Sequence, residues 1–381
     1  MNLADFLCYA DIRELGRIAE SCGCGCDDHS KNELIQAILN TVLRRDWMDR
    51  QADGLATADL RLVNALAFDP REGFSQEELA ARAMQAARDE GDGGETDARE
   101  LIARFRRRGW LFNGCSQQTK SLVQMPDDLK AALAAAIGRR FSRAVETAGE
   151  PSAYRDEHGL IQRDVKAFLS FVRNNPVPLT ADGVIYKRVL VQLLDGLAVR
   201  EEPLGRVGFR FGYGRKFRHY PDRFSFLYDY CFHFGLVAED DGELRLTPEG
   251  ARRLAADGEE DLWQMVRYWL RLYRGPIPDV AALAYWTLHL AGGWITVRSL
   301  VDCLRPLARP FFYDSPETVL ERRIIRMLMH LGLLRLGEHE TRGAVIRAHA
   351  AAAPILQRML RPGREAPRPG SAAPQRMRQP V

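Results

Sequence analysis

The residues best suited to chemistry lie in one basic and aromatic stretch, Gly205 to Arg223 (GRVGFRFGYGRKFRHYPDR). Six cations and one acid leave a charge of +5 over 19 residues, with five aromatic side chains between the cations. Cations neutralise phosphates, aromatic faces accept stacked bases at roughly 1–3 kcal/mol each, and glycines let a backbone approach closely. The side chains expected to touch nucleic acid are Arg206, Arg210, Tyr213, Arg215, Lys216, Phe217, Arg218, Tyr220 and Arg223. The alternative is a loop with packed aromatics and solvated arginines.

Two further groups of arginines lie on predicted helices, where they would face phosphates or base edges if those helices enter a groove. They are Arg104, Arg107, Arg322, Arg323 and Arg326. Solvated helix faces have the same composition, which is the alternative here. On the nucleic-acid interpretation, replacing Arg215, Lys216 and Arg218 together would flatten the salt dependence of binding by roughly two to three units.

The most metal-like string is CGCGCDDH, which contains Cys22, Cys24, Cys26 and His29. Structural zinc usually takes two cysteine pairs set apart in sequence, whereas this is one cluster with one-residue gaps that chelate poorly. A turn with reduced thiols is therefore favoured over a zinc site. The sequence has no H-E-x-x-H and no G-x-S-x-G motif, and we expect neither an enzyme nor a bound cofactor.

The elements that must position these residues recur three times. Each copy is an amphipathic helix that ends at Gly109, Gly235 or Gly332, followed by two short apolar segments around a polar turn. Glycine suits the left-handed position that stops a helix, and the paired apolar segments indicate a two-stranded hairpin. Two more helices precede each copy, and Ser75 and Glu78 form a capping box at the start of one of them. Three helices followed by a hairpin is the winged-helix arrangement.

The predicted fold class is therefore mainly α with small β-hairpins, organised as tandem winged-helix (helix-turn-helix) domains. A bridging helix is expected near 259–273, with Leu262, Val266, Trp269 and Tyr273 on one side. The predicted domains are a helical mini-domain at 1–48, winged-helix units at 55–148, 160–258 and 259–360 (the last with the bridging helix), and a disordered basic Pro/Arg tail at 361–381.

Composition restricts the cellular setting. The net charge of +3 is small for 381 residues, so any basic function must be local. The seven cysteines and the lack of a signal peptide predict a reducing cytoplasm, with nucleoid association as a variant. The uncharged run 280–297 approaches the length of a membrane span, but Gly292 and Gly293 would split it. A buried helix followed by a short strand is favoured, with no membrane contact.

Residues 165–197 resemble the N-terminal helicase-associated domain of XPB-type helicases. The telling residues are Leu179-Thr180, Asp182-Gly183 and Ile185-Tyr186-Lys187-Arg188, and the likeness continues to about 256. The resemblance implies a DNA-repair or transcription setting beside a motor. No G-x-x-x-x-G-K-[ST] phosphate loop is present, so the chain would be a free-standing relative. The mini-domain, whose second helix starts after Ser30, resembles the SAP and Rho N-terminal modules.

These observations predict a non-enzymatic nucleic-acid-binding accessory protein. DNA is the expected partner with RNA as an alternative, together with a helicase or nuclease supplied in trans. The competing hypothesis is a protein-docking scaffold of tandem winged helices, as in condensin-like or transcription complexes. Exposure of the recognition helices would favour nucleic acid, and their burial within the chain would favour docking.

Overall fold

The computed structural model describes residues 1–24, 30–88, 97–205, 214–256 and 258–360. Over these residues the chain is mainly helical with small antiparallel sheets, as the sequence predicts. The tail 361–381 lies outside the described residues, as do Arg206, Arg210, Tyr213, Cys26 and His29.

The N-terminal region is a group of short helices. They are α1 (Leu3–Tyr9), α2 (Ile12–Cys22), α3 (Lys31–Val42) and α4 (Arg45–Asp53). The predicted start of α3 is confirmed, because the Ser30 hydroxyl accepts a hydrogen bond from the Glu33 amide at 3.4 Å. Helices α1 and α4 were not expected, and α4 packs against the long helix α8 (Asp127–Ala144).

Three helix–hairpin motifs follow. The first contains α5 (Thr57–Ala67), α6 (Gln76–Ala87), α7 (Ala98–Arg107), β1 (Phe112–Asn113) and β2 (Val123–Gln124). The second contains α9 (Leu160–Asn174), α10 (Lys187–Asp195), α11 (Asp222–His233), β4 (Val237–Asp240), β5 (Glu243–Leu246) and α12 (Pro248–Ala255). The bridging helix α13 (Leu262–Tyr273) comes next.

The third motif starts with α14 (Val280–Leu290) and β6 (Ile295–Thr296), the helix and strand predicted for the apolar run. It continues with α15 (Val297–Leu304), η1 (Arg305–Leu307), α16 (Pro316–Thr318), the π-helical η2 (Val319–Ile325), α17 (Arg326–His330), β7 (Leu334–His339), β8 (Gly343–Ala348) and α18 (Ala352–Leu360). No helix among the described residues has the length and apolar character needed to cross a membrane.

The three motifs share one strand connectivity. In each, the segment after the first helix pairs with the last strand of the hairpin: Phe74 with Val123, Pro178 with Glu243, and Ile295 with Ile346. This pairing closes the hairpin back onto the helices, so each motif encloses its own apolar residues between sheet and helices.

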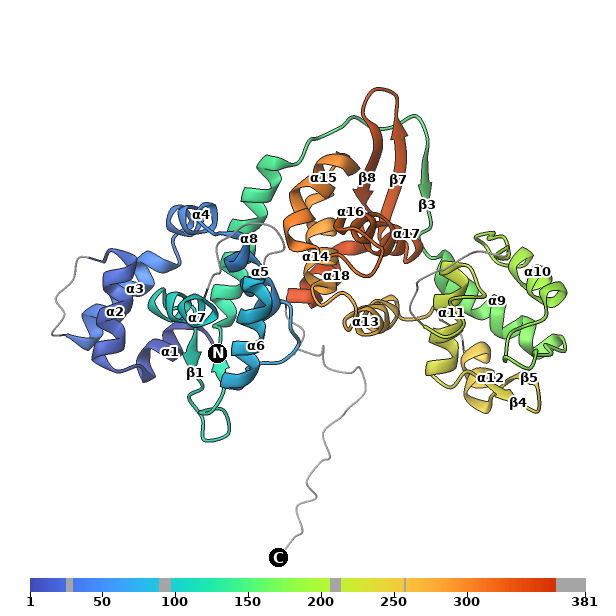
Figure 1. Cartoon of the computed structure of the whole chain (residues 1–381), viewed down its shortest axis with the longest axis horizontal. Helices are drawn as coiled ribbons and strands as arrows, with labels where there is room; N and C mark the ends of the chain where they lie inside the picture. Colours follow the sequence, from blue (N-terminus) through green and yellow to red (C-terminus); the bar gives the residue numbers. More distant parts are fainter. Residues whose placement is uncertain (25–29, 89–96, 206–213, 257, 361–381) are drawn as a thin grey trace, which may run out of the picture.

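The motifs are not arranged in chain order. Figure 1 shows the third motif between the first and the second, and the chain reaches the second by passing over the sheet of the third. On one edge of that sheet the Thr296 amide donates to the Glu146 carbonyl at 3.0 Å. On the other edge β3 (Tyr154–Asp156) pairs with β7. The segment between the predicted units 55–148 and 160–258 therefore carries a strand that covers an otherwise open sheet edge.

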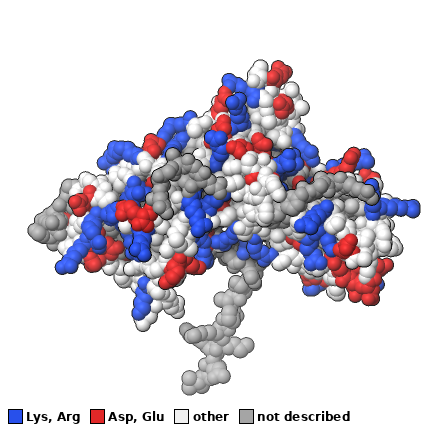
Figure 2. Space-filling model, viewed as in Figure 1, with Lys and Arg blue, Asp and Glu red and all other residues white. Residues whose placement is uncertain are grey.

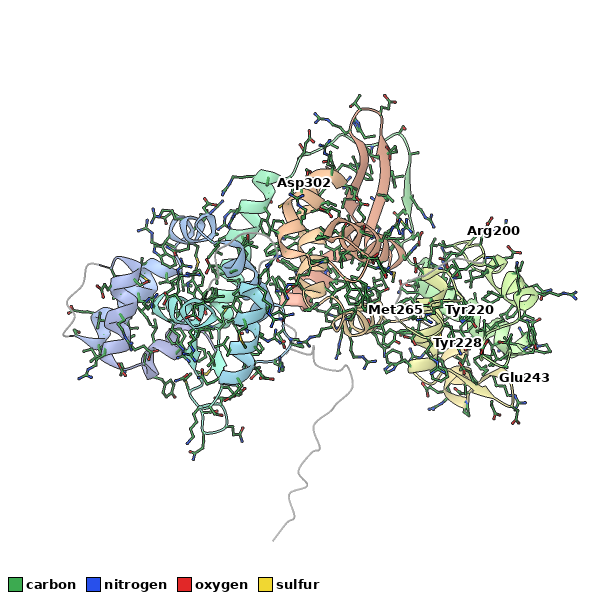
Figure 3. All side chains as sticks on the ribbon, viewed as in Figure 1. Arg200, Tyr220, Tyr228, Glu243, Met265 and Asp302 are labelled. Atoms are coloured by element: carbon green, nitrogen blue, oxygen red, sulfur yellow. The ribbon has the colours of Figure 1, made fainter. Side chains whose placement is uncertain are left out.

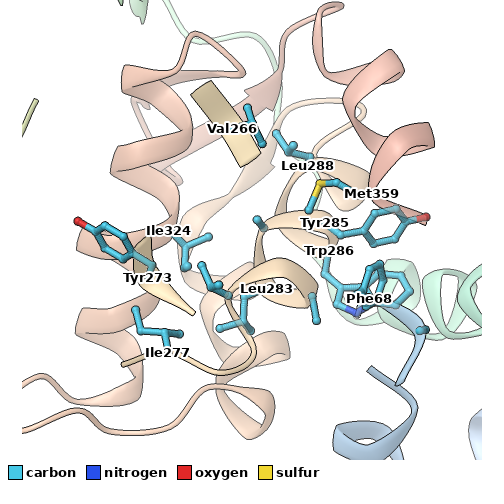
Figure 4. Packing of buried hydrophobic residues seen from close by; sticks show 14 of the residues in the cluster. Phe68, Val266, Tyr273, Ile277, Leu283, Tyr285, Trp286, Leu288, Ile324 and Met359 are labelled. Carbon is cyan, nitrogen blue, oxygen red and sulfur yellow. The ribbon is translucent and has the colours of Figure 1, made fainter. Parts of the chain in front are cut away.

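The first and third motifs share an aromatic junction. The ring of Phe68 lies 4.7 Å from that of Tyr285 and 6.0 Å from that of Trp286 (Figure 4). The Trp286 indole donates to the Asn64 side chain at 2.9 Å. Since Trp286 and Asn64 are both buried, this hydrogen bond between Trp286 Nε1 and Asn64 Oδ1 fixes α5 against α14.

The helix-ending glycines provide a stability test. Gly109, Gly235 and Gly332 have φ of +68°, +64° and +71°, as predicted for a helix stop. A Cβ on Gly332 would lie 2.7 Å from the His158 Cα, whereas a Cβ on Gly235 would meet nothing within 4 Å. We expect Gly235→Ala to cost about 1–2 kcal/mol of unfolding free energy from the backbone conformation alone. Gly332→Ala should cost clearly more in the same urea titration, and equal losses would contradict the packing described here.

Candidate nucleic-acid interface

Tyr220 belongs to the core, so its predicted role as a base-stacking residue is wrong. Its side chain is fully buried, with ring contacts to Phe224 at 5.1 Å and Tyr228 at 5.3 Å. Its hydroxyl accepts a hydrogen bond from the Ile185 amide at 2.9 Å, and burial raises the pKa of this hydroxyl to about 12. Figure 3 shows Tyr220 and Tyr228 inside the second motif. The aromatic residue stabilises the motif where we expected it to face a ligand.

Arg223 is also buried, which corrects its assignment as a phosphate ligand. Its Nη1 lies 2.5 Å from Asp164 Oδ2 and its Nε lies 3.4 Å from Glu157 Oε2. His330 Nδ1, from the third motif, lies 2.9 Å from the same Glu157 oxygen. All four residues are less than a tenth exposed. The cluster therefore joins the second and third motifs through buried charge.

The surroundings of this cluster shift the pKa values of the carboxyl groups in it and next to it. Burial alone would raise the pKa of Glu157, but the hydrogen bond from His330 and the charges of Arg155 and Arg223 lower it below its usual value. Burial raises the pKa of Glu201, which accepts hydrogen bonds from the amides of Arg223 and Phe224 at the start of α11. None of the three Arg223 guanidinium nitrogens makes a well-directed hydrogen bond to a described residue, so proximity of opposite charge is the main interaction of the side chain.

Of the other described residues in the predicted loop, Arg215 and Lys216 already have partners within the chain. The Arg215 guanidinium lies 3.1 Å from Glu239 and 3.7 Å from the centre of the Phe232 ring. Lys216, in the left-handed backbone region at φ +61°, donates to the Asp182 carbonyl. Phe217 is half-buried, while Arg218 is exposed and lies over the Phe217 ring at 5.7 Å. Over the described part of the loop, 214–223, the exposed charge is thus smaller than the sequence suggests.

The predicted recognition helix of each motif is the helix that precedes its hairpin, and these three helices differ in exposure. Residues 223–231 of α11 are all buried, so this helix cannot enter a nucleic-acid groove in this arrangement. Arg323, in the third motif, is buried and pairs with Asp314 at 2.8 Å, which corrects its assignment. Arg322 and Arg326 are exposed one turn apart. In the first motif Arg104 pairs with the buried Asp59 at 2.7 Å, and the exposed Arg107 pairs with Glu100.

A basic surface with more exposed arginines than the described part of the loop lies along α13. The sequence predicted this segment only as a bridging helix. Val266, Trp269 and Tyr273 are buried, as predicted for one side of this helix. The opposite side carries Arg267, Arg271 and Arg274 at i, i+4 and i+7, and all three are exposed. In Figure 2, Lys and Arg side chains gather at the lower centre, where Figure 1 places α13.

These arginines line a groove of about 540 Å³ between the first and third motifs. Its walls come from α5, α6, α13, α14 and α18. The charged lining residues are Arg82, Arg267, Arg271, Arg274, Arg358, Asp69, Asp261 and Asp279. The apolar lining includes Phe68, Trp263, Leu270, Val280 and Met359. A smaller hollow of about 280 Å³ shares Arg82, Arg274 and Pro278 with the groove and extends it past α13.

Asp69 organises one end of the groove. Its buried carboxylate pairs with Arg71 at 3.1 Å and also with Arg82 and Arg274. Burial alone would raise the pKa of Asp69, but the hydrogen bonds from Arg71 and the charges of Arg82 and Arg274 lower it. The guanidinium groups of Arg71 and Arg82 lie over the Phe74 ring at 5.0 and 4.7 Å. The geometry at this end is therefore held before any ligand arrives.

The other end carries uncompensated charge. Among the described residues no carboxylate pairs with Arg267, and the guanidinium of Arg358 lies over the Trp263 ring at 5.9 Å. Arg271 contacts His233, whose pKa is lowered by burial and by the Arg271 charge. Of the lining acids, Asp279 is buried, and its burial raises its pKa. Asp261 is exposed, but it faces four exposed arginines of the lining, Arg267, Arg271, Arg274 and Arg358, so the rim of the groove is net positive over an apolar floor.

The two described cysteines of the metal-like string have other surroundings. Cys22 is buried in α2. This burial, with a smaller contribution from the nearby Cys24, raises the pKa of its thiol to about 12. The Cys24 thiol donates to the Ala37 carbonyl at 3.5 Å. Over the part of the chain that the structure describes, no three His, Cys, Asp or Glu side chains gather in a metal-binding cluster.

Comparison with protein-family models, with curated proteins and with solved structures found no match to this chain.

Proposed function

We propose that this chain is a non-enzymatic nucleic-acid-binding accessory protein whose main contact surface is the groove along α13. The observation that carries the proposal is the row of Arg267, Arg271 and Arg274, joined by Arg358 across the groove. Arginine stays protonated at any physiological pH and its planar fork matches phosphate oxygens. Arginines at about 5–6 Å intervals on one helix face can contact successive phosphates of a nucleic-acid backbone. Such contacts do not depend on the base sequence.

The architecture supports the same class of protein. We interpret each helix–hairpin motif as a winged helix, because its short strand pairs with the last strand of its hairpin. The resemblance of residues 165–256 to the helicase-associated domain of XPB-type helicases favours DNA as the ligand and a motor protein as the partner. In this proposal the second motif supplies the motor contact, since its α11 is buried, and the groove supplies the nucleic-acid contact.

The test is a titration of the full chain into a fluorescein-labelled DNA oligonucleotide at salt concentrations from about 50 to 200 mM. Each phosphate contact contributes about −0.7 to −0.9 to the slope of log affinity against log salt. The three groove arginines that pair with no carboxylate among the described residues, Arg267, Arg271 and Arg358, predict a slope of about −2 to −3, and the exposed Arg322 and Arg326 would add to it. A salt-independent signal, or no binding at the lowest salt, would refute the proposal.

The burial of α11 favours a second candidate, a protein-docking scaffold. A covered recognition helix leaves the outer faces of its motif available for a partner protein. Affinity purification with and without nuclease separates the two candidates. A partner retained after nuclease treatment, combined with no oligonucleotide binding by the isolated chain, would replace nucleic-acid binding with docking.

A further inference from the structure

We infer that the α13 groove takes a single strand, with bases against its apolar floor and phosphates along its arginine rim. This inference rests on the proposed function and specifies its ligand. It follows because one concave site combines an apolar floor with an arginine rim. The outer surface of a duplex does not complement that combination.

The floor of the groove is apolar and inset. Phe68, Val280 and Met359 are less than a tenth exposed but still line the hollow, and Leu270 and Trp263 are half-buried beside them. The outside of a duplex presents phosphates and sugars, and its bases are stacked within. Contact with an apolar floor would not stabilise a bound duplex. The unstacked bases of a single strand, in contrast, can pack against such a floor and gain binding free energy.

Trp263 is the residue placed to stack a base. It lies at the start of α13, with its amide donating to the Asp261 side chain at 3.0 Å, so its backbone is fixed. Its ring is half-buried and borders the groove, and Arg358 from α18 lies at its face. An indole beside a guanidinium offers one base a stacking surface and its phosphate a charge partner.

The arginines define a path for the backbone that starts at this ring. From Trp263 the exposed face of α13 presents Arg267, then Arg271, then Arg274. Arg274 also borders the smaller hollow, so the path continues between α6 and the residues after α13. The helix rises about 1.5 Å per residue, so Trp263 to Arg274 covers about 16 Å. That length corresponds to a few nucleotides and lies within the range for single-strand sites.

The experiment compares a fluorescein-labelled oligothymidylate of about 15 nucleotides with a blunt duplex of the same length, using the full chain at about 100 mM salt. We expect the single strand to bind at least about tenfold more tightly. Trp263→Ala should weaken single-strand binding about tenfold while changing duplex binding less than about twofold, and Trp263→Phe should retain most of the affinity because it keeps a ring face.

The possible outcomes separate the single-strand inference from the proposed function. Equal or tighter duplex binding, or an equal effect of Trp263→Ala on both ligands, would overturn the single-strand inference and leave the proposed function standing. Failure of both oligonucleotides to bind would overturn the proposed function itself. If Trp263→Ala lowers thermal stability, the comparison of wild type on the two ligands still decides. Arg358→Ala then tests the same end of the groove from an exposed position.

Discussion

Replacing Arg267, Arg271 and Arg358 together by alanine is expected to weaken oligonucleotide binding about tenfold or more and to flatten its salt slope by about two to three units. These three arginines are exposed on the groove rim, and no carboxylate among the described residues neutralises Arg267. Each lost phosphate contact removes the release of one condensed counterion. The measurement is fluorescence anisotropy at several salt concentrations.

The matched control removes the same charge elsewhere. Arg173, Lys187 and Arg188 are exposed on α9 and α10 of the second motif, away from α13 in Figure 1. Their triple alanine variant should change the slope by less than about one unit, because only the long-range field is altered. Equal losses in the two variants would mean that overall charge, and not the groove, determines binding.

The loop first suspected from the sequence should behave like the control. Arg215 is already paired with Glu239 and Lys216 with a backbone carbonyl, so among these three substituted residues Arg218 is the main cation that remains for a ligand. Substituting all three should therefore flatten the slope by no more than about one unit, where the sequence alone suggested two to three.

Replacing Arg223 by methionine is expected to destabilise the chain by about 3–5 kcal/mol. The substitution keeps an unbranched apolar stem but leaves Glu157 and Asp164 as buried carboxylates without their shared cation. The loss should be smaller at acid pH than near pH 8. In the variant the pKa of Glu157 would rise, and a protonated carboxyl carries no buried charge. Urea unfolding at two pH values gives both quantities.

Two further variants identify the cause of this loss. Arg200→Met removes an exposed arginine that pairs with Asp195 at 3.1 Å, and it should cost less than about 1 kcal/mol. Adding Glu157→Gln and Asp164→Asn to Arg223→Met should recover much of the stability, since no buried charge then remains. A triple variant as unstable as Arg223→Met alone would show that the arginine acts through its packing volume.

Local signals in the sequence predicted most of the helices and hairpins. The capping box is present as expected, with Ser75 and Glu78 exchanging hydrogen bonds at 3.1 and 3.2 Å. The glycine stops have positive φ, and each predicted hairpin is antiparallel. These features depend on residues within a few positions of one another, so no knowledge of tertiary contacts is needed to find them.

The candidate site required contacts that the sequence does not contain. The spacing of Arg267, Arg271 and Arg274 was visible, but their importance depends on α5 and α6 packing opposite them, about 200 residues away in the chain. The cluster of Arg223 likewise depends on Glu157 and His330 from distant segments. One signal was available: FSFLYDYCFHF is apolar on nearly every side, which is typical of a buried helix and not of one that enters a groove.

The most direct test of the α13 groove is photochemical crosslinking of the full chain to a bromouridine-substituted single strand, followed by mass mapping of the modified peptides. The groove assignment predicts adducts between residues 262 and 274 and near Arg358, lost in the groove triple variant and kept in the charge-matched control. Adducts confined to 214–223 or to the Arg322–Arg326 face would contradict it.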